Sequence, residues 1–225
     1  MSETAMSETP QDVMVARARE MIPVLRERAR DAEKNRAVPR ETFDQFAEEG
    51  FFRIHQPERF GGSGWDIGMM VRLGAELGQG CGSSCWIFSN LAVQNWILGM
   101  NKPEAQEDVW GDNPLALIAS SFPAKGGKVV RTDGGLIANG LWSFASGVDF
   151  ADWNNMQVFV PPVDGEGPPE HRFALVPKAD YEIVDDWFAP GLAGTGSRSI
   201  KLDNVFIPLS RKRGTSSPSP RARWP

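Results

Sequence analysis

Residues 115–123, Leu-Ala-Leu-Ile-Ala-Ser-Ser-Phe-Pro, lie where the pattern of the sequence changes from helical to strand-like. Before this stretch, apolar residues recur every three or four positions, which is typical of helices that bury one face. After it, short β-branched runs are separated by clusters of Gly, Pro and Asp, which predicts strands joined by turns. Because helices come first and strands follow, the sequence predicts an α+β fold: an N-terminal all-helical domain and then an antiparallel β-domain.

The predicted boundaries divide the chain of 225 residues into four parts. Residues 1–10 form a polar tail, 11–112 the helical domain and 113–208 the β-domain. Residues 209–225 are rich in Ser, Pro and Arg and contain no acidic residue, a composition that cannot build a core. We expect both tails to be disordered.

Several features mark the ends of the predicted helices. Pro23 is expected either to kink the first helix or to begin a second one. Asp66 is a predicted N-cap, and Ser83 or Ser84 is predicted to cap the following helix. That helix contains residues 85–100, CWIFSNLAVQNWILGM, which are apolar on most faces and therefore predict a central position.

Composition and charge narrow the range of functions. The net charge of -5, with no basic face before residue 210, argues against a nucleic-acid partner. No apolar run approaches the ~20 residues that span a bilayer, and the N-terminus lacks the features of a signal peptide, so we expect a cytoplasmic protein without membrane contact. Only His55 and His171 are histidines, and Cys81 and Cys85 are expected to be buried thiols, which argues against a Ser-His-Asp hydrolase and against a metal site.

Two glycine-rich stretches are candidates for nucleotide binding. Residues 61–68, GGSGWDIG, do not follow a predicted strand, and residues 191–197, GLAGTGS, lead into a strand and not a helix. Neither therefore has the context in which a Rossmann helix holds a pyrophosphate. Residues 194–197 still offer consecutive N–H groups and two hydroxyls that can hold a phosphate or a ring carbonyl, although a plain tight turn explains them equally well.

Residues 140–153, GLWSFASGVDFADW, surround a Ser-Gly pair with four aromatic side chains. Strand alternation would place Trp142 and Phe144 on one face, with Ser146 next on that face. Such a face could form the wall of a site for a flat heteroaromatic ligand, with Ser146 and the Gly147 amide at the ligand's edge. The same pattern is typical of an ordinary core strand, and the residues alone leave both interpretations open.

The order of these segments resembles the acyl-CoA dehydrogenase superfamily over residues 15–208. The W-x-F-A-S-G-x-x-x-A-x-W and G-x-x-G-T-G-S patterns are similar to its branch of two-component, group D flavin-dependent monooxygenases, which hydroxylate phenols, steroid intermediates and polyketides. The segments that carry the resemblance are PERFGGSG, PEAQEDVWG, ASSFPAKGGKVVRTDGG, GLWSFASGVDFADW and GLAGTGSRSIKLDNVFIP.

The resemblance implies an oxygenase that uses reduced FMN or FAD, supplied by a separate flavin reductase, and O2. The reaction would pass through a flavin C4a-hydroperoxide and hydroxylate a small aromatic or polycyclic substrate. Family members also carry a C-terminal four-helix bundle through which they form homo-oligomers. That bundle is missing after residue 208, so we expect a truncated chain without that means of assembly. The alternatives are an acyl-CoA dehydrogenase-type FAD oxidoreductase and a non-catalytic fragment.

The resemblance also implies roles for individual residues. Ser146 matches a serine near flavin N5 and is the predicted catalytic residue. Where the branch often has a histidine in the central helix, this chain has Gln94 and Asn95, which we expect to contact substrate without removing its proton. The predicted cofactor-binding residues are Trp142, Ser146, Gly147, Ser120, Ser121, Thr195, Gly196 and Ser197.

Overall fold

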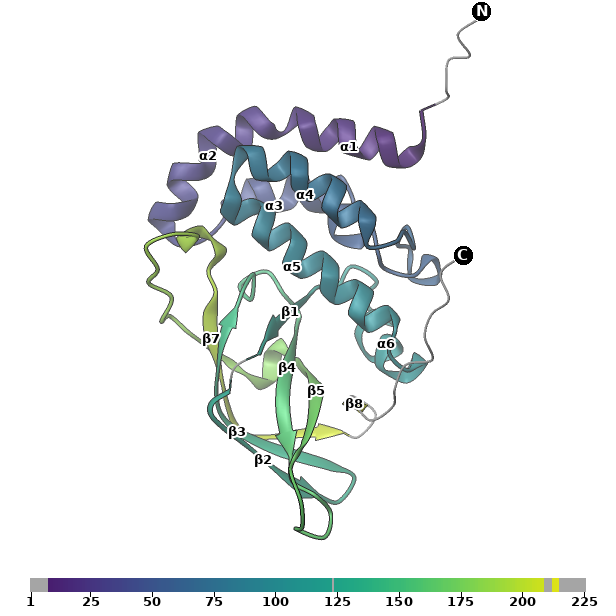
Figure 1. Cartoon of the computed structure of the whole chain (residues 1–225), viewed down its shortest axis with the longest axis vertical. Helices are drawn as coiled ribbons and strands as arrows, with labels where there is room; N and C mark the ends of the chain where they lie inside the picture. Colours follow the sequence, from purple (N-terminus) through teal and green to yellow (C-terminus); the bar gives the residue numbers. More distant parts are fainter. Residues whose placement is uncertain (1–7, 123, 209–211, 215–225) are drawn as a thin grey trace, which may run out of the picture.

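The computed structural model describes residues 8–122, 124–208 and 212–214. Figure 1 shows the helices gathered in one half of the molecule and the strands in the other, as the change of pattern at residue 115 predicts. The α-helices are α1 (Pro10–Glu20), α2 (Ile22–Asn35), α3 (Arg40–Glu48), α4 (Gly68–Gly80), α5 (Gly82–Gly99) and α6 (Pro103–Trp110). Short 3-10 helices are η1 (Phe51–Arg53), η2 (Glu58–Phe60), η3 (Lys178–Asp180) and η4 (Ala193–Thr195).

The ends of three helices test the predicted boundaries. Pro23 lies in the first turn of α2, so it begins a second helix and does not kink the first. The predicted cap at Asp66 is wrong by one residue, because Ile67 holds the N-cap position while the Asp66 carboxylate accepts from the Gly68 N–H at 2.7 Å. The predicted serine cap of α5 is also wrong, since the Cys81 sulfur accepts from the Ser84 N–H at 3.5 Å.

Helix α5 lies between the helical half and the sheets (Figure 1). It packs against α4 and η1 on the helical side and against β1 and η4 on the strand side. Because α5 has neighbours on more than one face, apolar residues are needed on most of its circumference. Among the residues that the structure describes, no helix is both long and apolar enough to cross a membrane.

The strands form two four-stranded sheets, in the orders β1-β4-β5-β8 and β2-β3-β7-β6. The described strand pairings are antiparallel apart from β1 with β4, which is parallel. The chain leaves β1 to form β2 and β3 in the other sheet before it returns as β4, and such a crossover permits the parallel direction. The strands are β1 (Ile118–Ser121), β2 (Ala124–Thr132), β3 (Gly135–Ala145), β4 (Trp153–Val160), β5 (Glu170–Pro177), β6 (Glu182–Val184), β7 (Arg198–Pro208) and β8 (Lys212–Gly214).

Trp142 of β3 joins the two sheets. Its side chain is fully buried, and its indole N–H donates to the Gln157 carbonyl of β4 at 2.7 Å. A Cβ at position 127 of β2 would lie 2.6 Å from the Trp142 ring, so the glycine there leaves room for the indole. Contacts of β2 with β4 and of β1 with β3 complete the packing of one sheet on the other.

The predicted tails lie largely outside the described residues. Where the structure does describe them, it differs from the prediction at two places. Thr9 caps α1 and exchanges hydrogen bonds with Asp12, so the ordered helical part begins before residue 11. Lys212–Gly214 pairs with β5 as strand β8 within the range that the composition predicts to be disordered.

Candidate functional site

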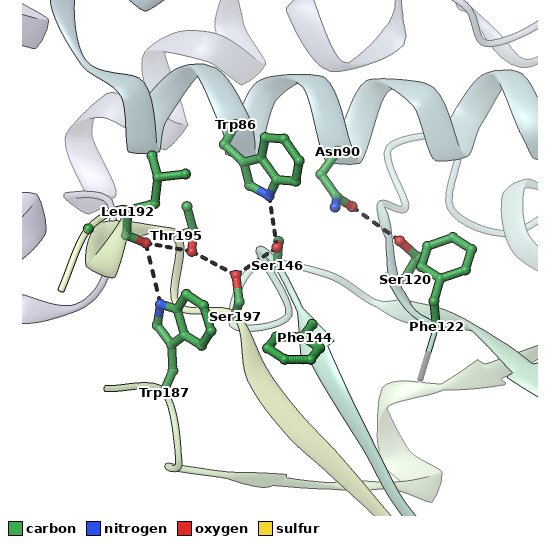
Figure 2. A pocket seen from close by; sticks show the side chains of 11 residues that line it. Trp86, Asn90, Ser120, Phe122, Phe144, Ser146, Trp187, Leu192, Thr195 and Ser197 are labelled. Atoms are coloured by element: carbon green, nitrogen blue, oxygen red, sulfur yellow. Dashed lines mark hydrogen bonds between the residues drawn. The ribbon is translucent and has the colours of Figure 1, made fainter. Parts of the chain in front are cut away.

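A cavity of about 390 Å³ opens between α5, the end of β3 and the segment that carries η4 (Figure 2). Its volume lies in the range that is usual for small-molecule and cofactor sites. Four aromatic side chains and several hydroxyl groups face it, so the lining is apolar with a few polar groups (Figure 2). The lining residues are Trp86, Asn90, Ser120, Phe122, Phe144, Ser146, Trp187, Gly191, Leu192, Thr195 and Ser197.

A bulge in β3 shapes one wall of this cavity. The pairing of β3 with β7 changes register between Trp142 and Ala145, and Phe144 adopts a left-handed backbone with φ of 64°. The bulge turns Phe144 outward against Trp187, with ring centroids 5.9 Å apart, while Trp142 stays between the sheets. The prediction that Trp142 and Phe144 share a strand face is therefore wrong, because an extra residue interrupts the alternation. Trp142 does not line the cavity, which places the predicted flavin neighbour in the core.

Three hydroxyl groups from distant parts of the chain meet beside the cavity (Figure 2). The Ser146 and Ser197 oxygens are 2.7 Å apart, and the Ser197 and Thr195 oxygens are 2.6 Å apart. At one end of this row, the Trp86 indole N–H donates to Ser146 at 3.0 Å. At the other end, Thr195 donates to the Leu192 carbonyl at 2.8 Å. The fold thus brings together three of the predicted cofactor-binding residues.

The two predicted serines of β1 point in opposite directions, as neighbours on a strand do. Ser120 lines the cavity, and its hydroxyl is 3.4 Å from the Asn90 side-chain oxygen. Ser121 is fully buried and donates to the Asn154 side-chain oxygen at 2.7 Å. Only Ser120 is therefore in a position to meet a ligand in this cavity.

The two predicted glycines serve the backbone. The Gly147 N–H donates to the Thr195 carbonyl at 3.2 Å, which corrects the expectation that this amide faces a ligand. Gly196 takes a left-handed conformation with φ of 52°, and its N–H donates to the Ala193 carbonyl at 3.2 Å. Both glycines hold the loop that carries Thr195 in place beside β3, and neither lines the cavity.

A substitution at Gly147 should distinguish how much stability is lost through backbone strain and how much through crowding against α5. Its φ is 76°, and an alanine Cβ would lie 3.3 Å from both Ile87 and Leu91 of α5. We expect Gly147→Ala to lower the free energy of unfolding by about 2 to 3 kcal/mol in urea titrations, since strain and crowding add. Gly165→Ala is the matched control, because its φ is 77° but nothing lies within 4 Å, so about 1 kcal/mol is expected. Equal losses of stability in the two variants would show that α5 does not constrain the backbone at Ser146 and Gly147.

The predicted substrate-binding amides do not reach the cavity. Gln94 accepts from the Asn155 side chain at 2.9 Å, and Asn95 donates to the Phe52 carbonyl at 2.7 Å. Both are buried, and the residues of α5 that line the cavity are instead Trp86 and Asn90. The sequence reasoning missed these two, although their spacing of four residues places them on one helix face. Gln94 continues that face by one further turn, where β4 covers it.

Glu33 of α2 holds the η4 segment against the helical half. Its carboxylate accepts from the N–H groups of Ala193 at 2.8 Å and Gly194 at 3.3 Å, and from the Ser83 hydroxyl. Burial raises the pKa of Glu33, but these three hydrogen bonds outweigh it and bring the pKa below its usual value. No local pattern around Glu33 signals this role, because its partners lie 50 and 160 residues away.

Removing the charge of Glu33 should weaken its hydrogen bonds to the η4 segment, and the resulting loss of stability should depend on pH. The pKa of Glu33 is lowered in the folded state. The contribution of its carboxylate to the free energy of unfolding is therefore fully present above the unfolded pKa of about 4.3 and is lost as the pH falls through the folded pKa. We expect Glu33→Gln to lower the free energy of unfolding by about 1 kcal/mol at pH 7 and by less near pH 3.5. Urea titrations at both pH values measure this. Glu27→Gln, on the exposed face of α2, is the control that should show no deficit at either pH. A loss of stability in Glu33→Gln that does not change with pH would show that the charge of Glu33 is not what stabilises the η4 segment.

The cavity offers binding groups and no proton-transfer groups. Among its lining residues, all of which the structure describes, none is acidic, basic or a histidine. General acid-base chemistry at neutral pH therefore has no side chain here to carry it. The arrangement suits a flat heteroaromatic group held between aromatic walls, with hydroxyl oxygens at its edge.

Comparisons with known proteins find relatives among the oxygenase components of flavin-dependent monooxygenases. Residues 9–110 match the family model described as acyl-CoA dehydrogenase, N-terminal domain. The chain is 39% identical over 193 residues to the flavin-dependent monooxygenase oxygenase subunit HsaA of Rhodococcus jostii. The aligned residues cover 85% of this chain and 49% of that protein. It is 38% identical over 199 residues to the oxygenase component of an FADH2-dependent resorcinol hydroxylase of a Rhizobium strain. The aligned residues cover 88% of this chain and 48% of that protein.

A solved structure extends the similarity to the fold. The crystal structure of the HsaA monooxygenase from Mycobacterium tuberculosis superimposes with a TM-score of 0.86 at 34% identity, over 92% of this chain and 56% of that one. The fold prediction is thereby confirmed. The chain spans about half the length of the curated relatives that it matches.

Proposed function

Because this chain belongs to the acyl-CoA dehydrogenase superfamily, in its branch of flavin-dependent monooxygenase oxygenase components, we propose that it binds reduced flavin beside Ser146 for the hydroxylation of an aromatic or polycyclic substrate. A separate flavin reductase would supply the reduced FMN or FAD. The observation that carries the proposal is the row of hydroxyls formed by Ser146, Ser197 and Thr195, which borders a cavity with aromatic walls.

The lining residues fit an isoalloxazine ring. Such a ring is flat and largely apolar, and its hydrogen-bonding atoms lie along its edge. Trp86, Phe144 and Trp187 provide flat apolar surfaces, and Phe144 and Trp187 meet edge to face at 87°. Ser146 and Ser120 provide hydroxyl groups at two places on the lining, where edge atoms of the ring could be met (Figure 2).

The chemistry of the reaction comes from the cofactor, since reduced flavin supplies the electrons that activate O2. The residues of this chain bind and orient the ring between the aromatic side chains of the cavity. Ser146 is the polar group best placed to contact the ring edge, because its hydroxyl borders the cavity and is fixed by two hydrogen bonds. Ser146 is buried from bulk solvent and still lines the cavity, so its oxygen is available to a ligand there.

The proposal is tested by anaerobic titration of the chain with reduced FMN and reduced FAD, followed by mixing with O2 and resorcinol or p-hydroxyphenylacetate. We expect saturable binding of reduced flavin and hydroxylation of at least one phenol, with hydrogen peroxide as the product when no phenol is present. Tight binding of oxidised FAD that is bleached by an acyl-CoA would show a dehydrogenase instead. Failure of a folded chain to bind either form of flavin would show a non-catalytic role.

A further inference from the structure

The hydrogen bonds beside the cavity form a row. The chemistry of its two ends decides which oxygen donates and which accepts in each bond, and this is what we call the direction of the row. The row runs from Trp86 through Ser146, Ser197 and Thr195 to the Leu192 carbonyl (Figure 2). Each hydroxyl has one proton to donate and two lone pairs with which to accept. The indole N–H can only donate, and the carbonyl can only accept.

The Leu192 end sets the direction. Its carbonyl accepts from Thr195 at 2.8 Å, so the single proton of Thr195 is used there. Thr195 must then accept from Ser197 at 2.6 Å, which uses the proton of Ser197. Ser197 must in turn accept from Ser146 at 2.7 Å. The opposite direction would leave the oxygens of Thr195 and Leu192 in close contact with no proton between them, which is repulsive.

The Trp86 end agrees with this direction. Its indole N–H donates to Ser146 at 3.0 Å, so Ser146 accepts one hydrogen bond and donates one, to Ser197. One lone pair remains on the Ser146 oxygen, and no proton remains. Ser146 therefore offers the cavity an acceptor and no donor.

We propose that Thr195 is a positioning residue: by donating to the Leu192 carbonyl it fixes Ser146 as an acceptor, and the site thereby selects a ligand that presents an N–H group. This inference rests on the proposed function for the identity of the ligand. Reduced flavin carries a hydrogen on N5, whereas the N5 of oxidised flavin is only an acceptor. The direction of the row therefore favours the reduced over the oxidised cofactor.

Thr195→Val reverses the row without a large change of shape. It removes the acceptor of the Ser197 proton, so Ser197 is expected to donate to Ser146 and to turn the Ser146 proton into the cavity. The Leu192 carbonyl keeps the Thr195 backbone N–H at 3.1 Å and the Trp187 indole N–H at 3.4 Å, so it is not left without a donor. The variant should therefore fold. Thr195→Ser is the matched control, since it keeps the hydroxyl and loses only the methyl group.

The test compares dissociation constants of reduced and oxidised FMN, the reduced form under anaerobic conditions, for the wild type and both variants. We expect the wild type to prefer reduced FMN, and Thr195→Val to shift the ratio of the two constants about fivefold to tenfold toward oxidised FMN. Thr195→Ser should keep the wild-type ratio. A merely structural role would weaken both forms alike and leave the ratio unchanged.

The outcomes separate this inference from the proposed function. An unchanged ratio in folded Thr195→Val, or the same shift in Thr195→Ser, would overturn the role of Thr195 and leave flavin binding intact. Equal affinity of the wild type for the two forms would also overturn it. If the wild type binds neither form saturably, the proposed function fails, and the selection of a redox state fails with it.

Discussion

Trp142→Ala is expected to lower the free energy of unfolding by about 3 to 5 kcal/mol, the range for deleting a large buried aromatic side chain. Trp142 is fully buried between the two sheets, and its N–H bond to the Gln157 carbonyl joins β3 to β4. The loss would leave a cavity that β2 cannot fill, because the residue facing the ring is Gly127. Chemical unfolding followed by circular dichroism measures the effect.

Trp142→Phe is the informative companion, because it keeps a ring in the core and removes the N–H. We expect it to cost about 1 to 3 kcal/mol, since the Gln157 carbonyl loses its buried donor. The dissociation constant of reduced flavin should stay close to that of the wild type, since Trp142 does not line the cavity. A stable Trp142→Phe variant with strongly weakened flavin binding would support the role that the family resemblance implies and contradict the core position.

Ser146→Ala is expected to weaken the binding of reduced flavin by about tenfold to a hundredfold, because a ring N–H would be left buried without an acceptor. It should also leave the Trp86 N–H without its partner and interrupt the row of hydroxyls. Bound flavin would be held less firmly and shielded less well from water, so more of the consumed O2 should appear as hydrogen peroxide. Anaerobic titration and a peroxide assay measure the two effects.

Ser121→Ala controls for the loss of a buried serine hydroxyl near the site. Ser121 is fully buried and donates to Asn154, but it does not line the cavity. We expect this variant to lose about 1 kcal/mol of stability and to bind reduced flavin as the wild type does. The assignment of Ser146 would be contradicted if both variants changed flavin binding equally, or if neither did.

The order of helices and strands could be predicted from the sequence because burial imposes its own period on each kind of element. The parallel pairing of β1 with β4 could not, since four residues do not specify a partner or a direction. The tight turn at Gly196 is one of the two interpretations that the glycine-rich stretch left open. The hydrogen bond between Ser146 and Ser197 joins residues 51 positions apart and has no local signal.

The structure differs from the predicted arrangement of the site for three separate physical reasons. Alternation assumes a regular strand, and the bulge at Phe144 breaks it with a positive φ on a residue that is not glycine, which no residue pattern announces. Gln94 and Asn95 were expected at the site because they stand where the resembling branch often has a histidine. Which part of α5 borders the cavity depends on where β1 and β4 pack against the helix. Glu33 acts on the η4 segment from a distant helix and becomes apparent only in three dimensions.

The proposed hydrogen bond between bound reduced flavin and Ser146 can be observed directly. Reduced FMN with a nitrogen-15 label at N5 can be added anaerobically to the wild type and to Ser146→Ala, and the N5–H proton followed by NMR. If Ser146 accepts from N5–H, the wild type shows a downfield N5–H resonance that is protected from solvent exchange, and Ser146→Ala loses it or shifts it upfield with flavin still at saturation. An N5–H resonance that is the same in both proteins would contradict this hydrogen bond.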